Sequence, residues 1–123
     1  MTSFDLKVGD VVQIDLKPSK GAEQFKERPC LVVEAEISPL KLIIVLPITD
    51  ATGKTKGMLF VPIKDIEAAG LAKPSVIDCF QIRALDRIRI KKVLGHVEDD
   101  ILDKVRQRLA AILDIGQEHL LED

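Results

Sequence analysis

The sequence predicts a mainly β domain that ends in one α-helix, an α+β arrangement. From residue 8 to residue 97, apolar runs of strand length alternate with turn residues. After His96 the spacing of apolar residues changes from two to about 3.6, which is the period of an amphipathic helix. With 123 residues, of which 46% are hydrophobic, the chain can bury one core and is too short for two ordinary domains. We therefore expect a single domain.

Six apolar runs are the expected strands. The first alternates apolar and polar residues, as a half-buried strand does. Ser38-Pro39 joins the second and third runs so tightly that they predict a hairpin of central strands. Gly70 and Pro74 bar a long helix between the fourth and fifth runs, so residues 66–73 are expected to be a short connector. The expected strands cover residues 11–16, 30–37, 40–48, 58–63, 75–85 and 87–97.

The expected helix covers residues 98–116. Acidic residues 98–100 would occupy its first turn, where the helix dipole favours negative charge, and Gly116 would end it. The predicted division of the single domain 1–123 is therefore a β-barrel body over 1–97, the helix over 98–116 and an acidic tail over 117–123. The apolar stripe of the helix consists of Ile101, Leu102, Val105, Leu109, Ile112 and Leu113.

Charge is distributed unevenly along the chain. Residues 98–123 hold eight acids and three bases, a net charge of −5, so that with a total of −2 the other 97 residues carry +3. A cationic body suits an RNA-binding protein, although many folded domains show such an imbalance. Aromatic residues make up only 3% of the chain, without Trp or Tyr, so a stacking platform for bases is excluded and any RNA contact must rest on charges and polar groups.

Several kinds of protein are made improbable by what the sequence lacks. The longest apolar stretch, residues 40–48, is far below the roughly 20 residues of a membrane helix, and we expect a soluble, cytoplasmic protein without membrane contact. Cys30 and Cys79 lie in apolar runs with no second Cys or His at metal-ligand spacing nearby. They are expected to be buried reduced thiols, and no metal or cofactor is expected.

A series of motifs follows the strands in order. The chain opens with Gly9-Asp10-Val11-Val12-Gln13-Ile14-Asp15-Leu16, then Pro18, then Gly21-Ala22-Glu23-Gln24 and Arg28-Pro29; later come Pro47-Ile48-Thr49, Ser75-Val76-Ile77 and Gln81-Ile82-Arg83-Ala84-Leu85-Asp86. In this order and spacing, over nearly the entire chain, they resemble the MazF/PemK/Kid family of toxins of type II toxin-antitoxin systems. The resemblance implies a small SH3-like barrel of the CcdB/MazF toxin type.

The same resemblance implies a function. Members of the family are endoribonucleases that cut single-stranded RNA sequence-selectively and without metal, by attack of a 2'-hydroxyl that leaves a 2',3'-cyclic phosphate and a 5'-hydroxyl. They act as homodimers and are neutralised by an antitoxin protein whose disordered tail occupies the RNA groove. The partners expected for this chain are therefore single-stranded RNA, an antitoxin and a second copy of itself.

Arg28 and Thr49 are the expected catalytic residues. Cleavage builds negative charge on the phosphorane oxygens, which a fixed guanidinium stabilises, and Pro29 limits Arg28 to extended conformations. Thr49 follows the apolar run 42–48 directly, so its hydroxyl would emerge at a strand end, and the matching family residue contacts the scissile phosphate. Without the family, a surface Arg28 paired with Glu27 or Glu23, and Thr49 as a turn former, would be the simpler interpretations.

The other expected site residues follow from the family pattern. Gly21, Glu23, Gln24 and Lys26 belong to the loop that shapes the RNA groove in the family. Gln81 and Arg83 are expected to lie on one face of a strand. The general base is not obvious, because Phe80 and Ala22 replace the acid and the histidine that some members carry. Asp78, expected on the same strand face as Phe80, is a possible substitute.

Three further interpretations remain open. Arg83, Arg87, Arg89, Lys91 and Lys92 could form a track for phosphates or simply a half-exposed strand. The same barrel serves gyrase-poisoning CcdB-type toxins and binding modules, which have no need for the Arg28 and Thr49 pair. A regulatory homologue that binds RNA or antitoxin without cutting is the third, because of the departures at Ala22 and Phe80. His96 and His119 are not expected to be catalytic.

Overall fold

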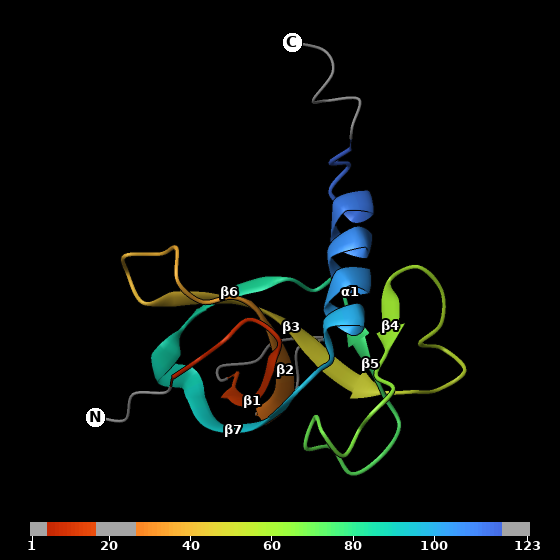
Figure 1. The fold of residues 1–123 in the computed structure, drawn as a ribbon, viewed down its shortest axis with the longest axis horizontal. Coiled ribbons are helices and arrows are strands. Elements are labelled where there is room, and N and C mark those ends of the chain that lie inside the picture. Colours follow the sequence, from red (N-terminus) through yellow and green to blue (C-terminus); the bar gives the residue numbers. More distant parts are fainter. Residues whose placement is uncertain (1–4, 17–26, 117–123) are drawn as a thin grey trace.

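A computed structural model of the protein describes residues 5–16 and 27–116 (Figure 1). This part of the chain is mostly antiparallel β-sheet followed by one α-helix, as the sequence predicts. The elements in chain order are β1 Asp10–Asp15, β2 Glu27–Glu34, β3 Leu42–Asp50, β4 Phe60–Pro62, β5 Ser75–Asp78, β6 Arg83–Asp86, the 3-10 helix η1 Arg87–Arg89, β7 Ile90–His96 and α1 Asp99–Ile112.

Strand β3 lies at the centre of the sheet. Its first half pairs antiparallel with β2 on one side and β6 on the other, and its last three residues pair with β5. From β2 the sheet continues to β1 and β7, and from β5 to β4. The expected hairpin is confirmed as β2 and β3. Figure 1 shows these strands curling into a barrel, with α1 standing upright beside it.

Two apolar clusters form the core, one on each face of the curled sheet. Val45 belongs to the cluster inside the barrel, to which β1, β2, β3, β6 and β7 all contribute. Its neighbour Leu46 points the opposite way, into the cluster that α1 covers with the buried residues Ile101, Leu102 and Val105. No helix in the described part of the chain is long and apolar enough to cross a membrane.

The prediction of one strand over residues 75–85 is wrong. The structure has two strands here, because the carboxyl group of Asp78 accepts a hydrogen bond from the backbone N–H of Phe80 (3.0 Å) and the chain turns over residues 79–82. Strand β5 therefore pairs with the end of β3, and β6 with its beginning.

Other boundaries also differ from the prediction. Arg87–Arg89 forms a 3-10 turn instead of a strand, because the side chain of Asp86 caps it by accepting from the N–H of Ile88. The strand expected over 58–63 shortens to β4. Helix α1 ends at Ile112, well before Gly116, and Asp114 takes a left-handed conformation with φ 56°.

The turn at residues 66–70 packs directly on β7. The N–H of His96 donates to the carbonyl of Ala68 (3.0 Å). A Cβ atom on Gly95 would collide with that same carbonyl oxygen, and one on Gly70, which has φ +76°, would collide with the carbonyl of Leu94. Two backbones can lie this close only because both positions lack a side chain.

Candidate active site

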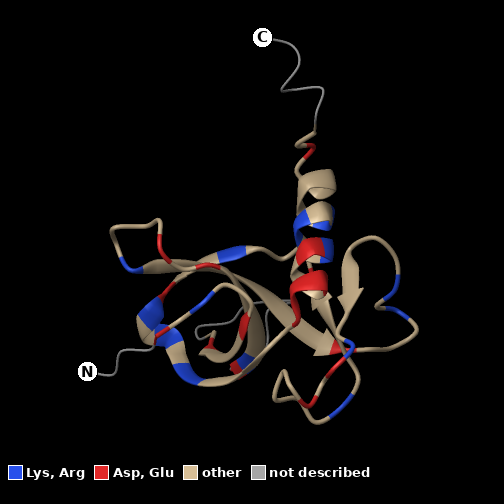
Figure 2. Cartoon of the chain, in the orientation of Figure 1, with Lys and Arg blue, Asp and Glu red and all other residues tan. Residues whose placement is uncertain are grey.

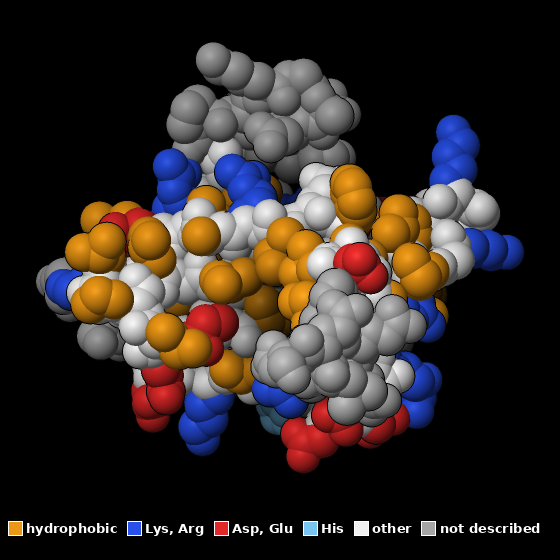
Figure 3. Space-filling view, turned by 90° about the horizontal axis from the view of Figure 1, so that it is seen from above, with side chains coloured by type: hydrophobic (Ala, Val, Ile, Leu, Met, Phe, Trp, Pro, Cys, Tyr) orange, Lys and Arg blue, Asp and Glu red, His pale blue; other side chains and the backbone are white. Residues whose placement is uncertain are grey.

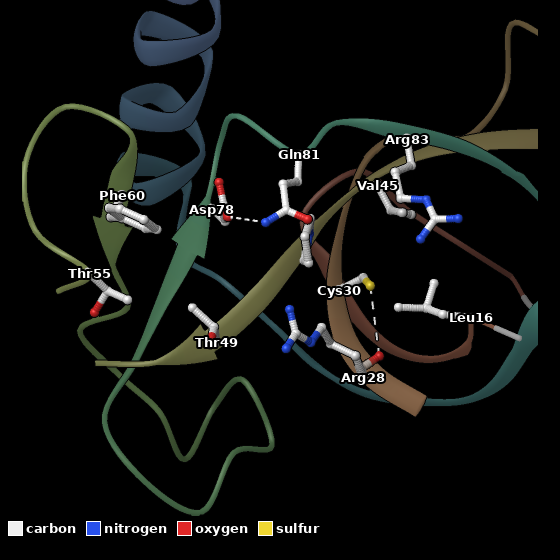
Figure 4. A pocket seen from close by; sticks show the side chains of 11 residues that line it. Leu16, Arg28, Cys30, Val45, Thr49, Thr55, Phe60, Asp78, Gln81 and Arg83 are labelled. Atoms are coloured by element: carbon white, nitrogen blue, oxygen red, sulfur yellow. Dashed lines mark hydrogen bonds between the residues drawn. The ribbon is translucent and has the colours of Figure 1, made fainter. Parts of the chain in front are cut away.

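A cavity of about 270 Å³ opens where the barrel's apolar core meets the surface (Figure 4). Its floor is apolar, since Leu16, Cys30 and Val45 all belong to the cluster inside the barrel. Its walls carry two guanidinium groups, two threonine hydroxyls, a carboxyl group and a carboxamide. Among the described residues, the lining consists of Leu16, Arg28, Cys30, Val45, Pro47, Thr49, Thr55, Phe60, Asp78, Gln81 and Arg83.

Strand register explains why these residues meet. Cys30 pairs with Pro47 across β2 and β3, and Arg28 and Thr49 each lie two residues farther toward the same end of that pair. Because side chains two apart on a strand share a face, Arg28 and Thr49 lie on the same face of neighbouring strands. Arg83 joins them because it pairs with Val45 on the other side of β3.

Arg28 is half-buried and projects into the cavity, toward Thr49 (Figure 4). It is the second residue of β2 and lies opposite Ile14 of β1, although the predicted strand begins only at residue 30. Glu27, one of the two acids considered as its surface partner, forms an ion pair with Lys91 (3.7 Å). Thr49 is likewise the penultimate residue of β3 and not the residue after it.

Asp78 and Gln81 form a hydrogen-bonded pair on one wall. Asp78 is buried, with 7% of its surface exposed. One of its carboxyl oxygens accepts from the N–H of Phe80, and the other accepts from Nε2 of Gln81 (2.8 Å). The predicted common strand face of Asp78 and Phe80 is wrong, because Phe80 lies in the turn and its side chain is exposed. Asp78 nevertheless reaches the cavity.

That pair sets the direction of the Gln81 carboxamide. Since its NH₂ group donates to Asp78, its carbonyl oxygen Oε1 points the other way, toward the cavity (Figure 4). The cavity is therefore offered a hydrogen-bond acceptor by Gln81 and donors by the two arginines.

Both cysteines are free, buried thiols, which confirms the prediction. Burial raises the pKa of Cys30 to about 12, against the opposing influence of Arg28 and Arg83, and burial raises the pKa of Cys79 to about 11. The Cys30 thiol on the cavity floor is consequently protonated at neutral pH and a poor nucleophile.

Some residues considered for the site are not among those that the structure describes, and others lie away from the cavity. Gly21, Glu23, Gln24 and Lys26 fall outside the described residues, as does His119. Arg87 donates to the carbonyl of Ala35 and Arg89 to that of Asp15 (3.2 Å), so both hold backbone in place. Of the five residues of the possible phosphate track, only Arg83 lines the cavity, and Lys91 and Lys92 are exposed on β7.

The sequence interpretation missed six residues of the cavity wall. Cys30, Val45 and Pro47 follow from the strand register once the pairing is known, whereas Thr55 and Phe60 come from a loop whose position the sequence does not reveal; Leu16 is the sixth. Among residues 5–16 and 27–116, no three His, Cys, Asp or Glu side chains are grouped so that they could hold a metal ion.

Comparison with known proteins places the chain in a family. Residues 7–113 match the family described as PemK-like, MazF-like toxin of type II toxin-antitoxin system. The chain is 38% identical over 108 residues to Endoribonuclease EndoA of Bacillus subtilis (strain 168), an alignment that covers 85% of this chain and 90% of that protein.

Solved structures of other proteins have the same fold as this chain. MazF from Deinococcus radiodurans superimposes with a TM-score of 0.71 at 25% identity, covering 91% of this chain and 99% of that one. An endoribonuclease from a mycobacterial species, solved in complex with its cognate antitoxin, has the same fold, with a TM-score of 0.68 at 17% identity over 88% and 94% of the two chains. This protein is therefore a member of the PemK-like, MazF-like toxin family of type II toxin-antitoxin systems.

Proposed function

We propose that this protein is a toxin endoribonuclease that cuts single-stranded RNA sequence-selectively at the cavity between β2, β3 and β6, in the cytoplasm and without a metal ion. The observation that carries the proposal is the meeting of Arg28 and Thr49, predicted from separate motifs, with Arg83 and Gln81 around one cavity. The family and the 38% identical endoribonuclease support the same activity.

The proposed reaction is attack by the RNA 2'-hydroxyl on its own phosphorus. The 2'-hydroxyl gives up its proton to solvent as it attacks, and the bond between phosphorus and the 5'-oxygen of the next nucleotide breaks. That oxygen takes up a proton from solvent, so the products are a 2',3'-cyclic phosphate and a 5'-hydroxyl. Negative charge grows on the phosphoryl oxygens as the phosphorane forms, so a guanidinium held beside them stabilises the transition state more than the ground state. Arg28 suits this role because β2 and Pro29 hold its backbone and its side chain faces the cavity.

Neighbouring groups orient the reacting phosphate. Thr49 can donate its hydroxyl proton to a phosphoryl oxygen, and the acceptor oxygen of Gln81 can receive a hydrogen bond from the RNA. Arg83 supplies a second positive charge for phosphate. Both carboxyl oxygens of Asp78 already accept hydrogen bonds, so its role is to position Gln81 and it is a weaker candidate for the general base than its sequence position suggested.

An antitoxin and a second copy of the chain are the proposed protein partners. The family is defined by toxins that pair with antitoxins. A dimer would cover an apolar face beside α1. We define this face as Ile44 and Ala84 of the sheet, Ile82 of the turn before β6, and Leu109, Ile112 and Leu113 of the helix. Ile44 pairs with Ala84 on the sheet face that α1 covers only in part, and Leu113 is 52% exposed. Figure 3 shows hydrophobic side chains spread over this side of the molecule.

The decisive experiment is cleavage of a long single-stranded RNA of known sequence in EDTA, with mapping of the ends. We expect cuts at a small set of sequences and the product ends given above. Arg28→Ala should keep the fold and lose at least about 100-fold in rate, because one charge-stabilising donor is removed. Arg106→Ala, which removes an exposed arginine of α1, is the matched control and should cleave normally.

Each alternative predicts a different result. A CcdB-type toxin would leave RNA intact and inhibit gyrase, and a regulatory homologue would bind RNA without cutting it. Cleavage that persists unchanged in Arg28→Ala would remove Arg28 from the mechanism.

A further inference from the structure

Arg108 of α1 holds the loop that joins β3 to β4. Its Nη1 atom donates to three backbone carbonyls in succession, those of Gly57 (3.4 Å), Met58 (2.9 Å) and Phe60 (3.3 Å). Arg108 is also half-buried, which strengthens each hydrogen bond relative to one made in water.

The backbone of Arg108 is held in place because helix α1 packs against the core. Ile101, Val105 and Arg108 follow one another at four and three residues, so they share one face of the helix. The first two are buried in the cluster between α1 and the sheet, with exposures of 1% and 0%. The guanidinium therefore projects from the packed side of a helix whose position the core fixes.

The loop that Arg108 holds forms one wall of the proposed active site. Thr55 and Phe60 line the active-site cavity and also a second, more open hollow of about 550 Å³. The residues that line this hollow are Thr55, Lys56, Gly57, Met58, Phe60, Pro62 and Arg108. The two spaces thus meet at the Thr55 and Phe60 wall.

The loop has its own internal structure and a positive charge. The hydroxyl of Thr55 accepts from the N–H of Thr52 (2.8 Å) and lies within hydrogen-bond distance of the Asp50 carbonyl (3.2 Å), which closes the turn after β3. Residues 51–59 include Lys54 and Lys56 and no acid (Figure 2). Such a segment can attract a phosphate chain that extends beyond the cavity.

We infer that Arg108 is a positioning residue that sets RNA binding and sequence preference beside the scissile phosphate. This inference rests on the proposed function. By holding the carbonyls of residues 57, 58 and 60, Arg108 places the Thr55 and Phe60 wall against which the neighbouring nucleotide lies. It acts through the loop and makes no contact with the reacting phosphate, since Arg28 and Thr49 occupy that part of the cavity.

The test compares Arg108→Ala and Arg108→Gln with the wild type on short RNAs that differ only at the nucleotides flanking the cut. Loss of the loop anchor should raise KM by about tenfold for the preferred RNA while kcat changes little, and should flatten the preference among flanking bases. Arg108→Gln keeps an NH₂ donor for the carbonyls without the charge, so it should recover part of the loss. Arg106→Ala is the control, because Arg106 lies two residues before Arg108, on the other side of the helix, and its ion-pair partner is Asp103.

A second readout does not depend on RNA cleavage. Trypsin cuts after lysine, and Lys54 and Lys56 lie in the anchored loop, so Arg108→Ala should be cut there faster than the wild type while the helical signal in circular dichroism stays the same. If the wild type cuts no RNA, the proposed function fails while this loop test still gives an answer.

Two results would overturn the inference. One is unchanged KM, preference and proteolysis in Arg108→Ala. The other is a fall of about one in the slope of log KM against log salt, with Arg108→Gln as poor as Arg108→Ala, because that result identifies Arg108 as a direct phosphate ligand.

Discussion

At the scale of single residues, the Asp78 and Gln81 pair makes a prediction about specificity. In Asp78→Asn, the remaining side-chain oxygen is needed by the N–H of Phe80, so the new NH₂ group faces Gln81. Gln81 must then turn its oxygen toward Asn and its NH₂ group toward the cavity. We expect the preferred base to change, with relative kcat/KM values for single-base RNA variants shifting by about tenfold.

A double-mutant cycle provides the control for this prediction. In a Gln81→Ala background, Asp78→Asn should have little additional effect, because the amide that it reorients is absent. A general base would behave differently: Asp78→Asn would slow the cleavage of every RNA by a similar large factor, with or without Gln81.

The sequence predicted most of the chemical groups at the site but not how they are held. Arg28, Thr49, Gln81 and Arg83 were found through motifs, but the common face of the first two follows only from the register of β2 with β3. The contact of Asp78 with Gln81 depends on the turn over residues 79–82, where the apolar sequence had predicted a continuous strand. Thr55 could not be placed, because its loop is anchored by an arginine 53 positions later in the chain.

At the scale of elements, the packing of the 66–70 turn on β7 predicts a steep cost for one added methyl group. Gly95→Ala would push its Cβ into the backbone of Ala68 and Ala69, which cannot move aside as a flexible side chain can. We expect the free energy of unfolding to fall by about 1 to 3 kcal/mol or more, measured by urea denaturation. Gly53→Ala is the matched control, because a Cβ there meets nothing within 4 Å, and it should be close to neutral. Equal stability of the two variants would contradict the packing described.

The presence of a strand or helix was easier to predict from the sequence than the residues at which a strand begins and ends. The period of two in β1 and the period of 3.6 in α1 are averaged over several residues, so they survive local exceptions. The ends depend on single hydrogen bonds. Asp86 capping Ile88 turned the start of an expected strand into η1, and an aspartate before a short run is a signal that could have been used.

At the scale of the whole molecule, the apolar face beside α1 predicts a homodimer. Sedimentation equilibrium should give a mass of twice the 13.6 kDa of the chain. Leu113→Glu places a charge at the end of α1 on that face and should shift the equilibrium toward the monomer, because an unpaired charge is costly to bury. Ile88→Glu, at an 83% exposed position on η1, should leave the dimer intact. A wild-type monomer at all concentrations would rule out the second copy as the partner of this face.

Because the strands that carry the site converge on β3, the cavity cannot form before β6 is present. A chain that has been synthesised only as far as β5 contains Arg28 and Thr49 but lacks Gln81, Arg83 and the anchoring helix. Pairings between such distant segments form only after the intervening chain is available. In a newly made chain, this cavity is therefore complete only after β6 and the helix that anchors its wall have been added.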